Sequence, residues 1–176
     1  ENDNQLGLAH FMEHMGFNGS KNFPKNELVD FLQKTGVDFG ADLNAYTSFD
    51  ETVYILSLPT EDAGMVDKGF TVLEDWAFNN LLDKTEIEKE RGVVLEESRL
   101  SKGSWERMSR QYFPKLLNGS KYAVRLPIGK DDILKNFKYE TLKNFYTSWY
   151  RPNLMAVIVV GDIDPADAEK KIIAHF

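Results

Sequence analysis

The stretch Leu6-Gly-Leu-Ala-His10-Phe-Met-Glu13-His14-Met15 gathers chemically active side chains in one predicted helix. In a helix, residues four apart are separated by one turn and about 40° around the axis, so the imidazoles of His10 and His14 point the same way. Glu13 lies on nearly the same face, three residues after His10. The order His-x-x-Glu-His reverses the more common His-Glu-x-x-His zinc-protease motif. It therefore predicts two nitrogen ligands for zinc with a carboxylate beside them.

Composition excludes several kinds of protein. The chain has 176 residues, 42% of them apolar, and a net charge of −7. This length fits a single domain with a substantial core. No apolar run approaches the roughly 20 residues of a membrane helix. The acidic charge argues against nucleic acid and an anionic membrane as partners. Because cysteine is absent, a disulfide framework and a cysteine-ligated zinc are excluded.

Caps, breakers and periodicity predict a mixture of helices and strands. Pro24 opens a helix that stops at Gly36, Thr60 caps a later one, and Thr85-Glu-Ile-Glu88 is a capping box. The mixture lacks regular strand–helix–strand alternation, which favours an α+β fold with a sheet packed against helices. The predicted helices cover about 6–15, 25–34, 60–79, 85–116 and 164–176, and the strands 52–58 and 154–160. Because two strands are too few for an independent sheet, more are expected in 38–49, in 120–128 and before residue 1.

Two histidines do not complete a catalytic zinc site, which takes three protein ligands and leaves one position for water. The best source of a third ligand is the segment 90–97. Two carboxylates and two valines share one helical stripe there, at Glu90, Val93, Val94 and Glu97. We expect this half-apolar stripe to face inward, where its carboxylates need a cation or a donor. A charged rim on an amphipathic helix is the alternative, and His175 is expected at the surface.

Several landmarks together resemble the pitrilysin/insulinase family of zinc metallopeptidases, in its bacterial form. A five-residue motif alone is modest evidence, whereas several landmarks in the right order are strong evidence. They are the inverted motif within 7–20, Asn44-Ala-Tyr-Thr-Ser-Phe-Asp-Glu-Thr-Val-Tyr54, the Glu-x6-Glu pair at 90 and 97, Leu126-Pro-Ile-Gly129, the segment 145–153 and Val160-Gly-Asp162.

The resemblance implies a role for each matching residue. His10, His14 and Glu97 become the ligands of a Zn²⁺ ion. Glu13 becomes the general base that activates a zinc-bound water for peptide-bond hydrolysis, and Glu90 a carboxylate near the site. The reaction implied is that of a zinc-dependent metalloendopeptidase.

The resemblance also implies how substrate binds. Asn44 and Ala45 would lie on the strand edge that receives a peptide or unfolded protein as an added strand. Residues 1–176 would form a single N-terminal catalytic domain of the pitrilysin/processing-peptidase type. Full members have a second homologous half, which would lie on the same or a separate chain. We therefore expect residues 1–176 alone to be weak or inactive.

Two other interpretations remain open. One is a catalytically incomplete peptide-binding or assembly module of the same fold, although the retention of Glu13 between the ligands argues against it. The other has no metal and treats His10 and His14 as ordinary residues of an amphipathic helix. Zinc content separates the enzyme from both. The composition fits either the bacterial periplasm or the cytoplasm, so the sequence leaves the compartment open.

Overall fold

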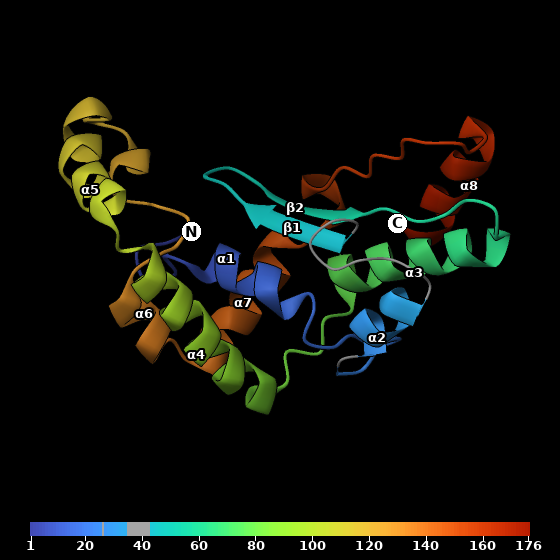
Figure 1. Ribbon diagram of the computed structural model, residues 1–176, viewed down its shortest axis with the longest axis horizontal. Helices are drawn as coiled ribbons and strands as arrows, with labels where there is room; N and C mark the ends of the chain where they lie inside the picture. The colour runs from blue at the N-terminus through green and yellow to red at the C-terminus, as the bar shows by residue number, and fades with distance from the viewer. Residues whose placement is uncertain (26, 35–42) are drawn as a thin grey trace. The chain divides into compact units, whose positions relative to one another are not determined.

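Two compact units make up the computed structural model, which describes residues 1–25, 27–34 and 43–176 (Figure 1). Each unit collects three separate stretches of the chain. The first unit comprises Glu1–Met15, Tyr46–Val53 and Asp83–Phe145, and the second comprises Gly16–Ala45, Tyr54–Leu82 and Tyr146–Phe176. Together they form an α+β fold rich in helix, as the sequence predicts.

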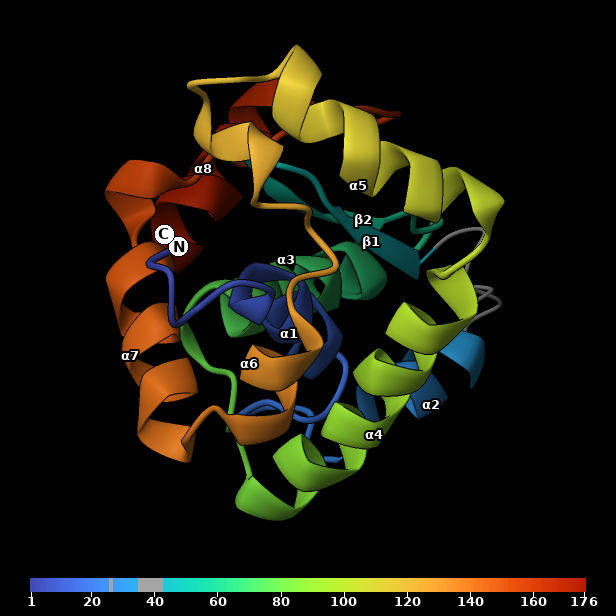
Figure 2. The ribbon, with the colours of Figure 1, turned by 90° about the vertical axis from the view of Figure 1, so that its left-hand side faces the viewer.

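The first unit is built mainly from helices. Helix α1 packs against α4, and α4 packs in turn against α6 (Figure 2). The helices that lie wholly in this unit are α1 (Leu8–Met15), α4 (Lys84–Ser101), α5 (Ser104–Leu116) and α6 (Asp131–Asn136), with the 3-10 turn η1 (Lys121–Ala123). Helix α7 (Tyr139–Trp149) begins here and ends in the second unit.

Helix α1 forms because its apolar residues repeat at helical spacing. Leu8, Phe11, Met12 and Met15 follow the i, i+3, i+4, i+7 pattern, and all four are buried. The carboxylate of Glu1 caps the helix start, accepting hydrogen bonds from the Gly7 and Ala9 amides at 3.1 and 2.9 Å.

A close crossing of two backbones sets the position of this helix start. A Cβ at Gly129 would lie 2.4 Å from the Cα of Gly7, and both glycines have positive φ, 81° and 101°. Only residues without a side chain permit that approach.

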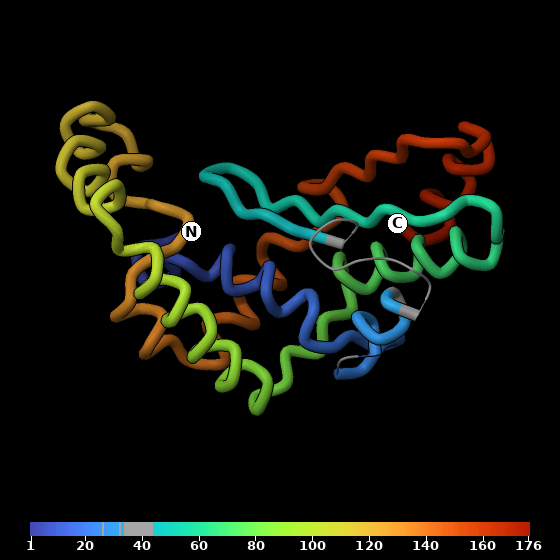
Figure 3. Tube along the Cα trace, viewed as in Figure 1, coloured from blue at the N-terminus to red at the C-terminus, as the bar shows by residue number. Residues whose placement is uncertain are grey.

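The two strands form a hairpin. Strand β1 (Leu43–Thr47) pairs with β2 (Thr52–Leu56), and the turn closes where the Ser48 amide donates to the Glu51 carbonyl at 2.8 Å (Figure 3). The strand expected within 38–49 is therefore present at 43–47. The expectations for Gly36 and for residues 38–42 lie outside the described residues.

The second unit packs around a small aromatic core. Trp76 is buried with Leu28 and Val72, and its indole N–H donates to the Gly16 carbonyl at 2.9 Å. Helix α3 packs against α8 in this unit. Its helices are α2 (Glu27–Lys34), α3 (Ala63–Phe78) and α8 (Pro165–His175), with the 3-10 turn η2 (Pro152–Leu154).

Several predicted boundaries are wrong for local reasons. The helix expected over 85–116 is two helices, because the chain leaves helical geometry at Lys102 and Gly103, and glycine costs about 1 kcal/mol in a helix interior. The caps are Asp83 and Asp62, in place of the expected Thr85 and Thr60. An aspartate accepts amide hydrogen bonds as well as a hydroxyl does.

The strand expected over 154–160 is also wrong. Residues 155–160 pair with no strand among the described residues, and Ile158 and Val160 are 82% and 91% exposed. Continuous apolar character favours burial but supplies no pairing partner. Residues 120–128 hold η1 and irregular chain in place of a strand. None of the helices in the described part of the chain has both the length and the apolar character for a membrane crossing.

Candidate metal centre

Four polar side chains converge within the first unit: His10 and His14 from α1, and Glu90 and Glu97 from α4. The Nε2 atoms of His10 and His14 lie 3.2 Å apart. The Oε2 atom of Glu97 lies 3.6 Å from the His10 nitrogen and 3.4 Å from the His14 nitrogen. These three atoms therefore form a nearly equilateral triangle, and they are the only trio of metal-ligand type found in the part of the chain that is described.

The donor set fits a zinc ion. Ligands placed tetrahedrally at 2.0–2.1 Å from zinc lie about 3.4 Å from one another, which matches the triangle. The pairing of His14 explains why its Nε2 is available: Nδ1 lies 2.7 Å from Oε1 of Glu90, so in the neutral ring Nδ1 carries the proton and donates it. Lone pairs then converge from the imidazole and the carboxylate, an arrangement that a cation stabilises.

The two histidines have different electrostatic surroundings. Burial disfavours the charged ring of His14, but its hydrogen bond to Glu90 and the charge of that carboxylate raise the pKa of His14 above its ordinary value. Burial, followed by the neighbouring His14, lowers the pKa of His10. The Nδ1 atom of His10 is buried and has no hydrogen-bond partner among the described residues. His14 is thus the histidine whose ring orientation the protein fixes.

The stripe that carries Glu90 and Glu97 straddles the edge of the buried face of α4. Val94 is fully buried, but Val93 is 52% exposed and the Glu97 side chain 49% exposed. At about 100° per residue, Val94, Glu90, Glu97 and Val93 follow one another around the helix in that order. The prediction that the whole stripe faces inward is therefore wrong at its Glu97 and Val93 side.

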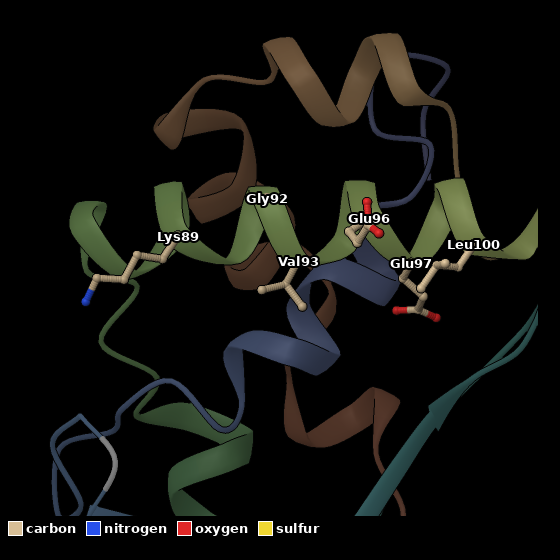
Figure 4. A pocket seen from close by; sticks show the side chains of 6 residues that line it. All are labelled: Lys89, Gly92, Val93, Glu96, Glu97 and Leu100. Atoms are coloured by element: carbon tan, nitrogen blue, oxygen red, sulfur yellow. The ribbon is translucent and has the colours of Figure 1, made fainter.

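A surface hollow runs along this exposed side of α4. Figure 4 shows Val93 and Glu97 projecting from the same side of the helix. The hollow is lined by Lys89, Gly92, Val93, Glu96, Glu97 and Leu100. Glu97 thus faces both the histidines and an open surface, which leaves room for a further molecule beside the candidate ligands.

Glu13 lies beside the histidines but is held by a different element. Glu13 is only 9% exposed, and the Thr47 hydroxyl at the end of β1 donates a hydrogen bond to its Oε2 atom. The charge of Glu13 also acts to raise the pKa of both histidines. The sequence places Glu13 next to the ligands but assigns no role to Thr47. A threonine at a strand end is too common to single out without the fold.

The remaining predicted residues lie in the other unit. Asn44 and Ala45 are the second and third residues of β1 and belong to the second unit, where the Ala45 amide donates to the Asn44 side chain at 2.8 Å. Their role at a substrate edge stays a prediction. His175, expected at the surface, is instead a partly buried residue whose Nδ1 lies 2.6 Å from Oε2 of Glu74.

Comparison with known families defines the class of protein. Residues 1–121 match the family model described as Insulinase (Peptidase family M16), and residues 136–176 match that of the Peptidase M16 inactive domain. The chain belongs to peptidase family M16.

Among individual proteins, the chain is similar to the probable zinc protease PqqL of Escherichia coli. The two are 42% identical over 168 residues, which cover 96% of this chain and 18% of PqqL. The crystal structure of the first half of the periplasmic protease PqqL from Escherichia coli matches with a TM-score of 0.94 at 41% identity, over 99% of this chain and 37% of that one.

A second solved relative has a similar fold. The ferredoxin protease FusC, crystallised in complex with Arabidopsis ferredoxin, matches with a TM-score of 0.91 at 33% identity, over 100% of this chain and 19% of that one. The present chain therefore spans less than a fifth of the length of PqqL and of FusC.

Proposed function

We propose that this chain carries the zinc-binding and catalytic residues of a metalloendopeptidase. The observation that carries the proposal is the triangle of Nε2, Nε2 and Oε2 atoms from His10, His14 and Glu97, with sides of 3.2, 3.6 and 3.4 Å. The name zinc protease, borne by relatives at 42% and 40% identity, supports the choice of ion.

Each residue has a task in this proposal. His10, His14 and Glu97 hold the ion, which when bound polarises a carbonyl group and lowers the pKa of a water to about 7. Glu13 accepts the proton of the attacking water and delivers it to the leaving amine. Glu90 holds the His14 ring through Nδ1, as carboxylates commonly do for metal-binding histidines.

The substrate and the complete enzyme are further parts of the proposal. A peptide or unfolded protein would add as a strand along Asn44 and Ala45, where main-chain hydrogen bonds bind with little reading of sequence. Residues 1–176 would act as an N-terminal catalytic domain together with a second homologous half, on the same or a separate chain. The short share of PqqL that they cover supports this. The description of PqqL as periplasmic supports a periplasmic location.

Zinc analysis combined with a conservative variant tests the function. In the protein at its natural full length, one zinc per chain is expected by elemental analysis, with an anomalous signal at the zinc edge between the three ligands. Glu13→Gln should keep that zinc and lose hydrolysis of labelled casein. Casein hydrolysis by pure Glu13→Gln protein at the unaltered rate contradicts the role of Glu13, and a folded protein without zinc contradicts the metalloenzyme.

A further inference from the structure

Two threonines face each other where the hairpin turns. Thr47 ends β1 and Thr52 begins β2, and their hydroxyl oxygens lie 3.2 Å apart. Thr47 Oγ1 also donates to Oε2 of Glu13. All three residues belong to the first unit, so the contacts lie within one compact body. A cross-strand threonine pair is thereby connected to the carboxylate proposed as the general base.

The chemistry of the groups fixes the direction of these hydrogen bonds. An ionised carboxylate only accepts, and a hydroxyl has one proton to donate. The Thr47 proton is directed to Glu13, so toward Thr52 the Thr47 oxygen can only accept. Thr52 is therefore the donor of that pair. The hydrogen bonds run from Thr52 to Thr47 to Glu13, and each polarises the next.

We propose that Thr47 is a positioning residue for Glu13 and that Thr52 orients Thr47. Glutamate has three rotatable side-chain bonds, and a proton acceptor must stay within hydrogen-bond reach of the atom it serves. Fixing Oε2 restricts those rotations and leaves Oε1 as the oxygen for proton transfer. This inference rests on the proposed function, because its consequence for rate requires Glu13 to be the base.

The kinetic test removes the hydroxyl but keeps the shape. In the zinc-loaded protein at its natural full length, Thr47→Val should lower kcat for casein about 10- to 100-fold, the scale for losing a hydrogen bond to a charged group or misplacing a catalytic group by 1 Å. KM and zinc content should not change. Thr47→Ser, which keeps the hydroxyl, should restore most of the rate.

Two further variants serve as controls. Thr71→Val removes a comparable hydroxyl, which donates to the Asp67 carbonyl at 3.1 Å on an exposed part of α3, and should leave kcat unchanged. Thr52→Val keeps the Thr47 hydroxyl and should cost only a few-fold in kcat, because it acts through one more hydrogen bond. If Thr47→Val does not fold, the loss of kcat in Thr52→Val tests the positioning of Glu13 instead.

Two measurements separate this inference from the proposed function. Crystal structures should show Glu13 in one conformer in the wild type and in Thr47→Ser, but displaced or spread over several conformers in Thr47→Val. Adding Thr47→Val to Glu13→Gln should not slow the residual casein hydrolysis of Glu13→Gln any further, since residues that act as a unit are not additive. An unmoved Glu13 with an unchanged kcat, or fully multiplicative losses, overturns the positioning role. If Glu13→Gln keeps its activity, the base assignment fails while the crystal structures still decide the positioning.

Discussion

Two histidine–glutamate pairs in this molecule have nearly the same geometry but different surroundings. His14 Nδ1 lies 2.7 Å from Glu90 Oε1 in the first unit, and His175 Nδ1 lies 2.6 Å from Glu74 Oε2 in the second. The opposite nitrogen of His14 faces His10 and Glu97, whereas the His175 ring stacks on Phe70, with ring centroids 6.0 Å apart. A histidine–glutamate pair is thus not in itself evidence of function. The evidence is what surrounds the rest of the imidazole ring.

The largest difference between the two pairs should appear in zinc content when the histidine of each is replaced. His14→Ala deletes one corner of the ligand triangle, so zinc content should fall from one per chain to near zero by elemental analysis. His175→Ala removes a histidine from a similar histidine–glutamate pair and should leave zinc at one per chain. Stoichiometric zinc in His14→Ala would show that the triangle is not the binding site.

Removal of zinc should lower the thermal stability of the protein only where the pair at His14 is intact. A ligand that binds only the folded state at 1,000 times its Kd stabilises by about 4 kcal/mol, roughly 10 °C in Tm for a chain of this size. A chelator should therefore lower Tm in the wild type and in His175→Ala. Differential scanning calorimetry should detect no chelator effect in His14→Ala. A chelator shift of the same size in that variant would place the ion elsewhere.

Replacing the glutamate of each pair with glutamine should give a smaller difference, measured as the affinity for zinc. Glu90→Gln keeps the shape but removes the charge behind His14, so the affinity for zinc should weaken about 10- to 100-fold. Competition with a fluorescent zinc chelator measures this change, and Glu74→Gln is the matched control with unchanged affinity. Equal affinities in the two variants would contradict the supporting role of Glu90.

The smallest effect should be the cost of breaking the second pair. The His175 and Glu74 side chains are 24% and 32% exposed, so water weakens their attraction. Glu74→Gln should lower the free energy of unfolding by at most about 1 kcal/mol, as for other partly solvated hydrogen-bonded pairs. Urea denaturation measures it, and a loss of several kcal/mol would mean that the pair anchors α8 far more strongly than its exposure suggests.

Local helical periodicity accounts for most of what the sequence predicts correctly. The spacing of His10 and His14 depends only on helix geometry, and Glu90 and Glu97 lie two turns apart on α4 for the same reason. The structure brings these pairs together, as predicted. The sequence could not reveal how far Glu97 is exposed, because exposure depends on which neighbouring elements cover α4.

Nonlocal contacts account for what the sequence could not predict. Thr47 reaches Glu13 only because the hairpin end lies beside α1. The segment 44–54 is one of the family landmarks, but nothing in the sequence pairs Thr47 with Glu13. The apolar run at 154–160 has strand character but finds no strand partner in the described chain. Pairing and register depend on segments far apart, whereas caps and periodicity depend on neighbours.

The backbone crossing of Gly7 and Gly129 has a consequence for the spacing of the candidate metal ligands. It fixes how far α1 is inserted beside its neighbours, because any side chain at the crossing would push the two chains apart. Ions of different radius require different separations between the same three donor atoms. An alanine at either position should therefore shift α1 and change the spacing of the candidate donor atoms, on which the fit to an ion of given radius depends, although neither glycine is itself a candidate ligand.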